Sequence, residues 1–421
     1  MPLVLSRHPT TTMPVQKTIL PNGIRVLSET LPHVGSASIG IWCQTGSADE
    51  LPKEAGITHF IEHMLFKGTP TRTAKQIAEE IEGRGGVLNA FTDKQTTCYY
   101  CQVLAEDGAD SFGVLADMVT NSLLDADELE REKQVVVEEI RRSQDDPGSH
   151  VHDLHLRSRW SNSILGLPVI GTTESVLSFT REDLASYMDR RYRGSSLIVS
   201  VAGRVEHDDV VSWASAALCP IAGGGEKTSI ERPGGTAEEN YFGKEVEQVH
   251  FCIGTDSPCP TDEDYYPLMV LDEIMGSGMS SRLFQEVREK RGLAYAIGSY
   301  SLGYSAGGAW TIYGGTSPKT WSEVQKLVRT EMDEMSANGP EDEELRRAKK
   351  SLAGGLILSL EGTGSRMRRM ARTEMAFGRE IPADEVVAKI KEVTADQVKA
   401  LAASMFDPAL VSTTAIGPEA K

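Results

Sequence analysis

Long hydrophobic runs are missing from this chain of 421 residues. No stretch approaches the roughly 18 consecutive apolar residues that a transmembrane helix needs, so we expect no membrane partner. The first residues, Met1 to Pro9, lack the apolar core of a secretory signal, and residues 10–13 resemble a short leader. These absences favour the cytoplasm.

Cysteine is also scarce: the six cysteines are spread from Cys43 to Cys259, and their spacing suggests no disulfide framework. Cys98 and Cys101 do form a C-x-x-C motif, for which a redox or second metal site is an alternative reading. The segment from Thr96 to Leu104 alternates like a β-strand, however, and residues three apart on a strand point to opposite faces. That geometry opposes both a bridge and shared ligation.

Positive charge is in the minority. There are 43 Lys and Arg residues against 61 Asp and Glu, giving a net charge of −18. A nucleic-acid partner is therefore not expected, because phosphates require a basic surface. An acidic protein is often simply well solvated, but an acidic interior would also attract basic peptides over long range.

The most informative motif is His59-Phe60-Ile61-Glu62-His63. On a helix, residues four apart lie on one face, so both imidazoles can reach one Zn²⁺ while Glu62 approaches a metal-activated water. The order H-x-x-E-H is the reverse of the commoner zinc-protease signature. The neighbouring apolar residues are typical of a helix core, and histidines at this spacing also occur by chance.

A second acidic helix lies downstream, over residues 129–142. Val135 and Val136 are expected on its apolar face, and Glu132 and Glu139 lie two turns apart. Two His and one Glu, with a fourth position left for water, form the ligand set of catalytic zinc sites. Spacing alone leaves open whether these acids are ligands or a solvated helix face.

Three separate runs, residues 56–69, 88–92 and 132–139, together resemble the pitrilysin-type zinc peptidases. The similarity is greatest to the branch of the mitochondrial processing peptidase β subunit and its bacterial relatives, and it extends over about residues 15–415. It implies a zinc-dependent endopeptidase that binds one Zn²⁺ per chain through His59, His63 and Glu139. It further implies Glu62 as the catalytic base and Glu132 as an acid that orients the site.

The same resemblance implies how substrate is held. Asn89 and Ala90 match a strand at a sheet edge to which the peptide adds as an extra strand. Arg288 and Tyr295, seven residues apart, match a pair that reaches the active site from the other domain. The implied substrates are extended, unfolded peptides or presequence-like segments, with a preference for basic ones, and a homodimer or a heterodimer with a related subunit is expected.

The second half of the sequence repeats the first. In the first half, strands are predicted over 15–28 and 36–45, a pair of strands over 87–104, and helices over 74–84 and 109–122. In the second half, a strand is predicted over 247–255, a pair of strands over 295–316, and helices over 264–275, 281–290 and 318–338. Aligning the halves pairs Glu62 with Glu273. The pairs of the other site residues are His59 with Val270, His63 with Ile274, Glu132 with Ala348 and Glu139 with Gly355. The second copy therefore lacks every proposed ligand.

These observations predict an α+β protein of two homologous α/β-sandwich domains that form a clamshell around a substrate chamber. The expected boundaries are 13–219 for the metal-binding domain, 220–240 for a Gly- and Pro-rich linker, and 241–419 for the degenerate repeat. Because half of the site would come from each domain, closure is expected to accompany catalysis.

Several alternatives stay open on the sequence alone. The chain could be a noncatalytic structural or partner subunit, although such subunits characteristically lose ligands, or a zinc hydrolase of a nonpeptide substrate. His150, His152 and His155 could mark a second metal. The Gly-rich stretches at residues 83–86 and 276–278 complete no phosphate-binding motif and are expected to be turns.

Overall fold

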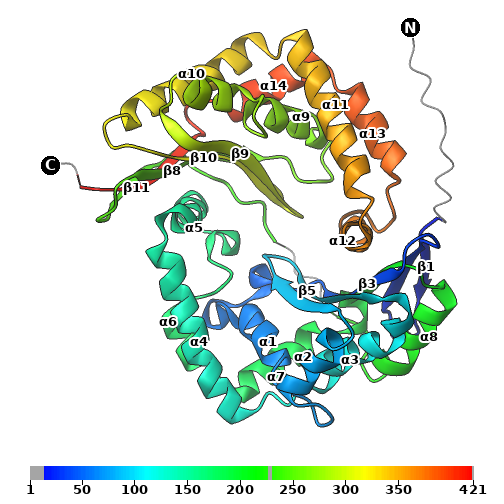
Figure 1. Cartoon of the computed structure of the whole chain (residues 1–421). Helices are drawn as coiled ribbons and strands as arrows, with labels where there is room; N and C mark the ends of the chain where they lie inside the picture. Colours follow the sequence, from blue (N-terminus) through cyan, green and yellow to red (C-terminus); the bar gives the residue numbers. More distant parts are fainter. Residues whose placement is uncertain (1–13, 226–229, 420–421) are drawn as a thin grey trace, which may run out of the picture.

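A computed structural model describes residues 14–225 and 230–419. The predicted leader at residues 10–13 and residues 226–229 of the predicted linker lie outside this range. Two mixed β-sheets, each with its own helices, face one another across the molecule (Figure 1). The α+β fold with two clamshell halves is thereby confirmed. In the described part of the chain no helix is both long and apolar enough to cross a bilayer.

The first sheet has six strands in the order β1-β2-β6-β3-β5-β4. Their bounds are β1 Gln16–Ile19, β2 Arg25–Thr30, β3 Ser36–Cys43, β4 Val87–Thr92, β5 Thr97–Leu104 and β6 Leu197–Gly203. The helices of this half are α1 Ile57–Leu65, α2 Ala74–Glu82, α3 Gly108–Asn121, α4 Ala126–Asp145, α5 Pro147–Arg159, α6 Thr173–Ser178, α7 Arg181–Arg191 and α8 His207–Leu218. The largest apolar core of the protein lies between this sheet and its helices.

The second sheet has five strands in the order β7-β11-β8-β10-β9. Its strands are β7 Glu239–Gly243, β8 Val249–Ser257, β9 Ala294–Tyr304, β10 Gly307–Thr316 and β11 Ser412–Gly417. Its helices are α9 Tyr265–Met275, α10 Trp321–Asn338, α11 Asp342–Ser359, α12 Thr363–Phe377, α13 Ala383–Glu392 and α14 Ala395–Met405. A separate apolar core fills the space between this sheet and those helices.

The internal repeat is visible in the strand pairing. In the first sheet β2 runs parallel to β6, and β3 runs antiparallel to both β6 and β5. In the second sheet β7 runs parallel to β11, and β8 runs antiparallel to both β11 and β10. Each sheet then ends in an antiparallel edge strand, β4 or β9. The two halves therefore share one topology, to which the first adds β1.

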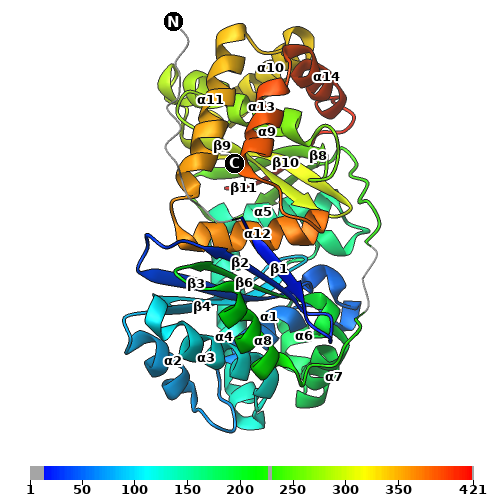
Figure 2. The same cartoon turned by 90° about the vertical axis from the view of Figure 1, so that its right-hand side faces the viewer.

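Each half also supplies one helix to the sheet of the other half. Helix α12 packs on β6, β3 and β2, where Met367 and Met370 join an apolar cluster with Trp42. Helix α5 packs on β8 and β11, where Val151 contacts Cys252 and Ile416. Both helices lie between the two sheets in both views (Figures 1 and 2). This reciprocal exchange buries apolar surface across the domain boundary and so stabilises the two halves against each other.

Three local predictions were wrong. The segment 15–28 is not one strand, because the turn at Pro21–Gly23 divides it into β1 and β2. Residues 284–289 form a π-helix rather than part of an α-helix. Val135 is half exposed, whereas Val136 and Val137 are buried, so the apolar face of α4 lies one residue further along than predicted.

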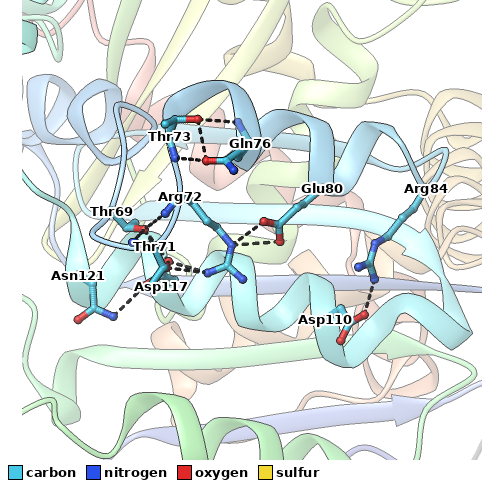
Figure 3. Close-up of polar contacts among 10 residues, drawn as sticks. All are labelled: Thr69, Thr71, Arg72, Thr73, Gln76, Glu80, Arg84, Asp110, Asp117 and Asn121. Atoms are coloured by element: carbon cyan, nitrogen blue, oxygen red, sulfur yellow. Dashed lines mark hydrogen bonds and ion pairs between the residues drawn. The ribbon is translucent and has the colours of Figure 1, made fainter.

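The loop after α1 is held by a dense polar network (Figure 3). Asp117 on α3 accepts hydrogen bonds from Thr69, Thr71 and Arg72 at 2.7, 2.9 and 2.7 Å. The Arg72 guanidinium also contacts both carboxylate oxygens of Glu80 at 3.0 Å. Although burial acts to raise the pKa of Asp117, these bonds outweigh it and the pKa lies below its ordinary value. The network therefore fixes the chain that leaves the C-terminal end of α1.

Candidate metal centre

Helix α1 begins at a point where only glycine fits. Gly56 has a φ of 89°, and a Cβ there would lie 2.6 Å from the carbonyl oxygen of Ile170. The Glu50 carboxylate accepts hydrogen bonds from the backbone N–H groups of Gly56 and Thr58 at 2.7 and 2.9 Å. The Glu50 side chain thus satisfies two N–H groups at the helix start that would otherwise lack a partner. Burial raises the pKa of this carboxyl to about 8. The start of α1 is thus fixed in both position and direction.

One face of α1 is buried in the first core, through Ile57, Phe60, Ile61, Met64 and Leu65. The opposite face carries the two histidines of the motif, whose ring centroids lie 4.6 Å apart with partly exposed side chains. The spacing of four residues therefore has the predicted effect of bringing both rings to one side of the helix.

Glu139 on α4 meets this face. Its Oε2 atom lies 3.9 Å from Nε2 of His59 and 3.6 Å from Nε2 of His63. Within residues 14–225 and 230–419, these three side chains are the one group of His, Cys, Asp or Glu residues with ligand atoms close enough to share a metal ion, all within 4.8 Å. Burial, and next the neighbouring His63, lower the pKa of His59 to about 4, so its ring is neutral and its nitrogen lone pair is free. Two imidazole nitrogens and a carboxylate oxygen suit the preferences of Zn²⁺.

Glu132 lies on α4 two turns before Glu139 and contacts the other ring nitrogen of His63. The distance between Nδ1 of His63 and Oε1 of Glu132 is 2.8 Å, and Nζ of Lys67 lies 2.5 Å from Oε2. Burial acts to raise the pKa of Glu132, but the bonds to His63 and Lys67 outweigh it and the pKa is lowered. An ionised Glu132 that accepts a hydrogen bond from the Nδ1–H of His63 keeps the proton on Nδ1, so the lone pair of Nε2 is free to bind a metal. Lys67 had no role in the sequence interpretation, because only the packing of α1 against α4 brings it to Glu132.

Glu62 lies on the same helix and is held at the end of β4. Its Oε2 atom accepts a hydrogen bond of 2.5 Å from the hydroxyl of Thr92. Burial raises the pKa of Glu62, although the Thr92 bond and the charge of His63 act in the opposite direction. Thr92 had no role in the sequence interpretation, in which it was only the last residue of a motif. Its contact places the carboxylate where an edge strand and the metal-binding face meet.

Asn89 and Ala90 lie on β4, which pairs with β5 on one side and forms the edge of the first sheet. The strand also contacts α1. The backbone N–H of Ala90 donates a hydrogen bond of 2.8 Å to Oδ1 of Asn89, its own neighbour. The Asn89 side chain therefore accepts the hydrogen bond of a backbone N–H group with which an added strand would pair.

Arg288 and Tyr295 lie in the second half and contact one another. The Arg288 guanidinium carbon is 4.9 Å from the Tyr295 ring centroid and 4.7 Å from that of Phe284. Tyr295 is 81% exposed, so its phenol is accessible to a ligand. No polar contact that the structure records over the described residues joins either side chain to the first-half site, and their role stays a prediction.

The other candidate clusters have structural partners. His152 contacts the Tyr300 hydroxyl at 2.7 Å, and His155 contacts the Thr414 hydroxyl at 3.1 Å, so each binds the second sheet. Cys98 and Cys101 are free and lie in different apolar clusters on opposite faces of β5, as predicted. In the second copy Val270 and Ile274 are buried in the core of α9.

Fold and site together define a class: a two-domain α+β protein whose first half carries a candidate metal centre of the catalytic type. The family model described as "Insulinase (Peptidase family M16)" matches residues 25–173. A second model, described as "Peptidase M16 inactive domain", matches residues 178–352. The chain belongs to peptidase family M16, and the resemblance to the pitrilysin-type peptidases is thereby confirmed.

Relatives span nearly the whole chain. An uncharacterised zinc protease of Streptomyces coelicolor is 39% identical over 96% of this chain and 90% of its own length. The uncharacterised zinc protease YmxG of Bacillus subtilis is 39% identical over 91% of this chain and 94% of its own length. These relationships support a peptidase role in general.

Solved structures agree on the fold. A peptidase M16 inactive domain from Pseudomonas fluorescens superimposes with a TM-score of 0.89 at 21% identity, covering 97% of this chain and 98% of the other. A protease from Helicobacter pylori superimposes with the same score and identity, covering 97% of this chain and all of the other. At this identity the likeness concerns the fold alone.

Proposed function

We propose that this protein is a zinc-dependent endopeptidase that cleaves extended, unfolded peptides. The observation that carries the proposal is the convergence of His59, His63 and Glu139 within 4.8 Å, with Glu62 on the same helix. A zinc ion held by these three residues would polarise the scissile carbonyl and lower the pKa of the attacking water. The family and the relatives named as zinc proteases support the choice of metal.

Glu62 is proposed as the general base. It takes up the proton of the attacking water and returns it to the leaving amine. Burial raises the pKa of this carboxyl and so brings it closer to the working pH, which suits a group that both accepts and donates a proton. Thr92 orients the carboxylate through its hydrogen bond.

The substrate is proposed to bind along β4. An edge strand offers backbone groups to an extended peptide, whereas a folded protein cannot present a free strand. Asn89 must release the N–H of Ala90 before a peptide can pair there, so its side chain would protect the edge when substrate is absent. The net charge of −18 favours the approach of basic peptides.

Arg288 and Tyr295 are proposed to complete the site from the second half. The guanidinium suits a peptide carbonyl, and the exposed phenol can donate to an oxygen on which negative charge develops. Because the pair belongs to the other half, its contribution requires that the two halves close on the substrate.

Removal and return of the metal test the proposed function. The purified protein is treated with a chelator, dialysed, and assayed on an unstructured 20-residue peptide of about neutral charge before and after one equivalent of Zn²⁺. Cleavage is expected to fall at least about a hundredfold and to return with zinc, because the metal supplies the activation of both water and carbonyl. Cleavage that persists without metal would contradict the zinc mechanism, and bound zinc without cleavage of any peptide would favour a noncatalytic subunit.

Two further peptides of the same length in that assay, one rich in Arg and Lys and one rich in Asp and Glu, measure the proposed charge preference. The basic peptide is expected to have the higher kcat/KM, and the difference should shrink as salt rises, because long-range attraction is screened. Equal values at low salt would remove the preference while leaving the peptidase assignment intact.

The Glu132→Gln variant is expected to bind zinc about ten- to a hundredfold more weakly, since this is the usual cost of losing a carboxylate behind a His ligand. The neutral amide no longer stabilises the His63 Nδ1 proton or the Lys67 charge. Competition with a chromophoric chelator measures the affinity. Glu130→Gln is the matched control, because Glu130 is exposed on the same helix and pairs with Lys133, and it should bind zinc as the wild type does.

A further inference from the structure

In the turn between β4 and β5, Gln95 forms two hydrogen bonds to the second half of the chain, and the neighbouring Thr96 hydroxyl donates a weaker one to Sδ of Met375 at 3.7 Å. The Gln95 amide donates a hydrogen bond of 2.6 Å to the Ser305 hydroxyl, and its Oε1 atom accepts one of 2.8 Å from the Ser305 backbone N–H. Ser305 lies in the turn between β9 and β10. Two hairpin turns, one from each half, are thus joined by a pair of hydrogen bonds.

An apolar cluster lies beside this contact and also includes both halves. Trp160, at the end of α5, is buried and its ring centroid is 6.1 Å from that of Tyr304, the residue before Ser305. Ala48 and Ala309 belong to the same cluster. The two halves are therefore packed together at this point, and the polar contact of Gln95 sets how the two turns are aligned.

The same turn is bound tightly to the segment before the metal-binding helix. The backbone N–H of Ser47 donates to the carbonyl of Asp93 at 3.2 Å, and that of Ala48 donates to the carbonyl of Lys94 at 2.7 Å. A Cβ at Gly46 would lie 2.3 Å from the Asp93 carbonyl oxygen, so the two segments are in close contact. Any displacement of the turn must therefore move residues 46–48.

From there the connection to the site is short on both sides. Glu50 directly follows the 3₁₀ turn Ser47–Asp49 and caps α1 through Gly56 and Thr58. On the other side of the turn, Thr92 is the last residue of β4 and holds Glu62. The turn at residues 93–96 thus connects directly to both the start of the metal-binding helix and the strand proposed to bind substrate.

We propose that Gln95 is a positioning residue, which through its contact with Ser305 makes the placement of α1 and β4 depend on the second half of the chain. The inference rests on the proposed peptidase function for its catalytic consequence. It explains how the second half, which carries no ligand, can influence the metal centre without touching it. Neither Gln95 nor Ser305 contacts the ligand atoms, so the effect is one of geometry.

The Gln95→Ala variant tests the proposal in two ways. Hydrogen exchange of the metal-free protein is expected to be at least fivefold faster over residues 44–61 and 87–96, because the turn loses both hydrogen bonds to Ser305 and keeps only the weaker contact of Thr96 with Met375. With zinc bound, kcat on an unstructured peptide is expected to fall about tenfold, the scale of two lost hydrogen bonds, with KM changed less than threefold. Gln95→Glu should restore both properties, since its carboxylate accepts from the N–H and the hydroxyl of Ser305.

Gln102→Ala is the matched control. Gln102 also donates its amide to a hydroxyl of the second half, that of Thr363 at 3.4 Å, but it lies at the far end of β5. Unchanged exchange over residues 44–61 in Gln95→Ala would overturn the proposal, as would equal effects of the two alanine variants. A wild-type protein that cleaves no peptide would refute the proposed function, while the exchange comparison would still decide the role of Gln95.

Discussion

The Glu62→Gln variant is expected to lose at least about a thousandfold in kcat on an unstructured peptide, within the range attributed to a general base and acid. Glutamine keeps the shape of the side chain and can still accept the Thr92 hydrogen bond, but its amide cannot take up a proton. Because Glu62 supplies none of the three converging ligand atoms, zinc content should remain one equivalent per chain. Metal analysis and peptide cleavage on the same sample separate these two effects.

The second copy supplies the control for this experiment. Glu273 is the counterpart of Glu62 in the internal alignment and lies on α9. On that helix the positions of the two histidines are taken by the buried Val270 and Ile274. Glu273→Gln should therefore leave kcat unchanged. If Glu62→Gln cleaves peptide at the wild-type rate with zinc bound, the general base is another group and the mechanism proposed for this helix is wrong.

The sequence allowed a good prediction of the local part of this site. Two His residues four apart on a helix share a face for purely geometric reasons, and the structure places His59 and His63 in this way. The edge position of β4 was also predicted, although from family resemblance rather than from its residues. Helical periodicity was a weaker guide on α4, where Val135 was placed on the apolar face but is half exposed.

Contacts between distant segments could not be predicted from pattern alone. Spacing left open whether Glu139 or any other acid of α4 faced the histidines, because the packing angle between α1 and α4 is set by the whole core. The exchange of α5 and α12 between the sheets has no local signature either, since the apolar residues of a helix do not identify the sheet that the helix covers. Gln95 and Ser305 are ordinary turn residues whose importance arises only from their pairing.

These long-range contacts share a physical consequence. Helix α1 is fixed at its start by Glu50 and beyond its end by the network around Asp117, so its histidines are held before any metal binds. Preorganisation of this kind lowers the cost of binding, because the ligands need not be ordered by the ion. Removing a ligand should then weaken metal binding without unfolding the protein.

The Glu139→Gln variant tests that expectation. It is predicted to weaken zinc binding at least about a hundredfold, because the loss of a hydrogen-bond partner behind a ligand already costs up to about a hundredfold and the loss of a ligand should cost more. The carboxylate contributes charge as well as an oxygen atom, and the amide that replaces it contributes no charge. Its side chain is 45% exposed, and its negative charge acts to raise the pKa of Glu62. Relief of that repulsion should leave the melting temperature of the metal-free protein unchanged or slightly higher.

Glu138→Gln is the adjacent control, since Glu138 is directed to another face of α4, where it pairs with Arg141. Its zinc affinity and peptide cleavage should match those of the wild type, while Glu139→Gln loses both with an unchanged circular dichroism spectrum. Equal zinc affinity in the two variants would show that Glu139 is not a ligand. A large fall in the melting temperature of metal-free Glu139→Gln would instead show that this carboxylate supports the fold, and that the scaffold holding His59 and His63 depends on it.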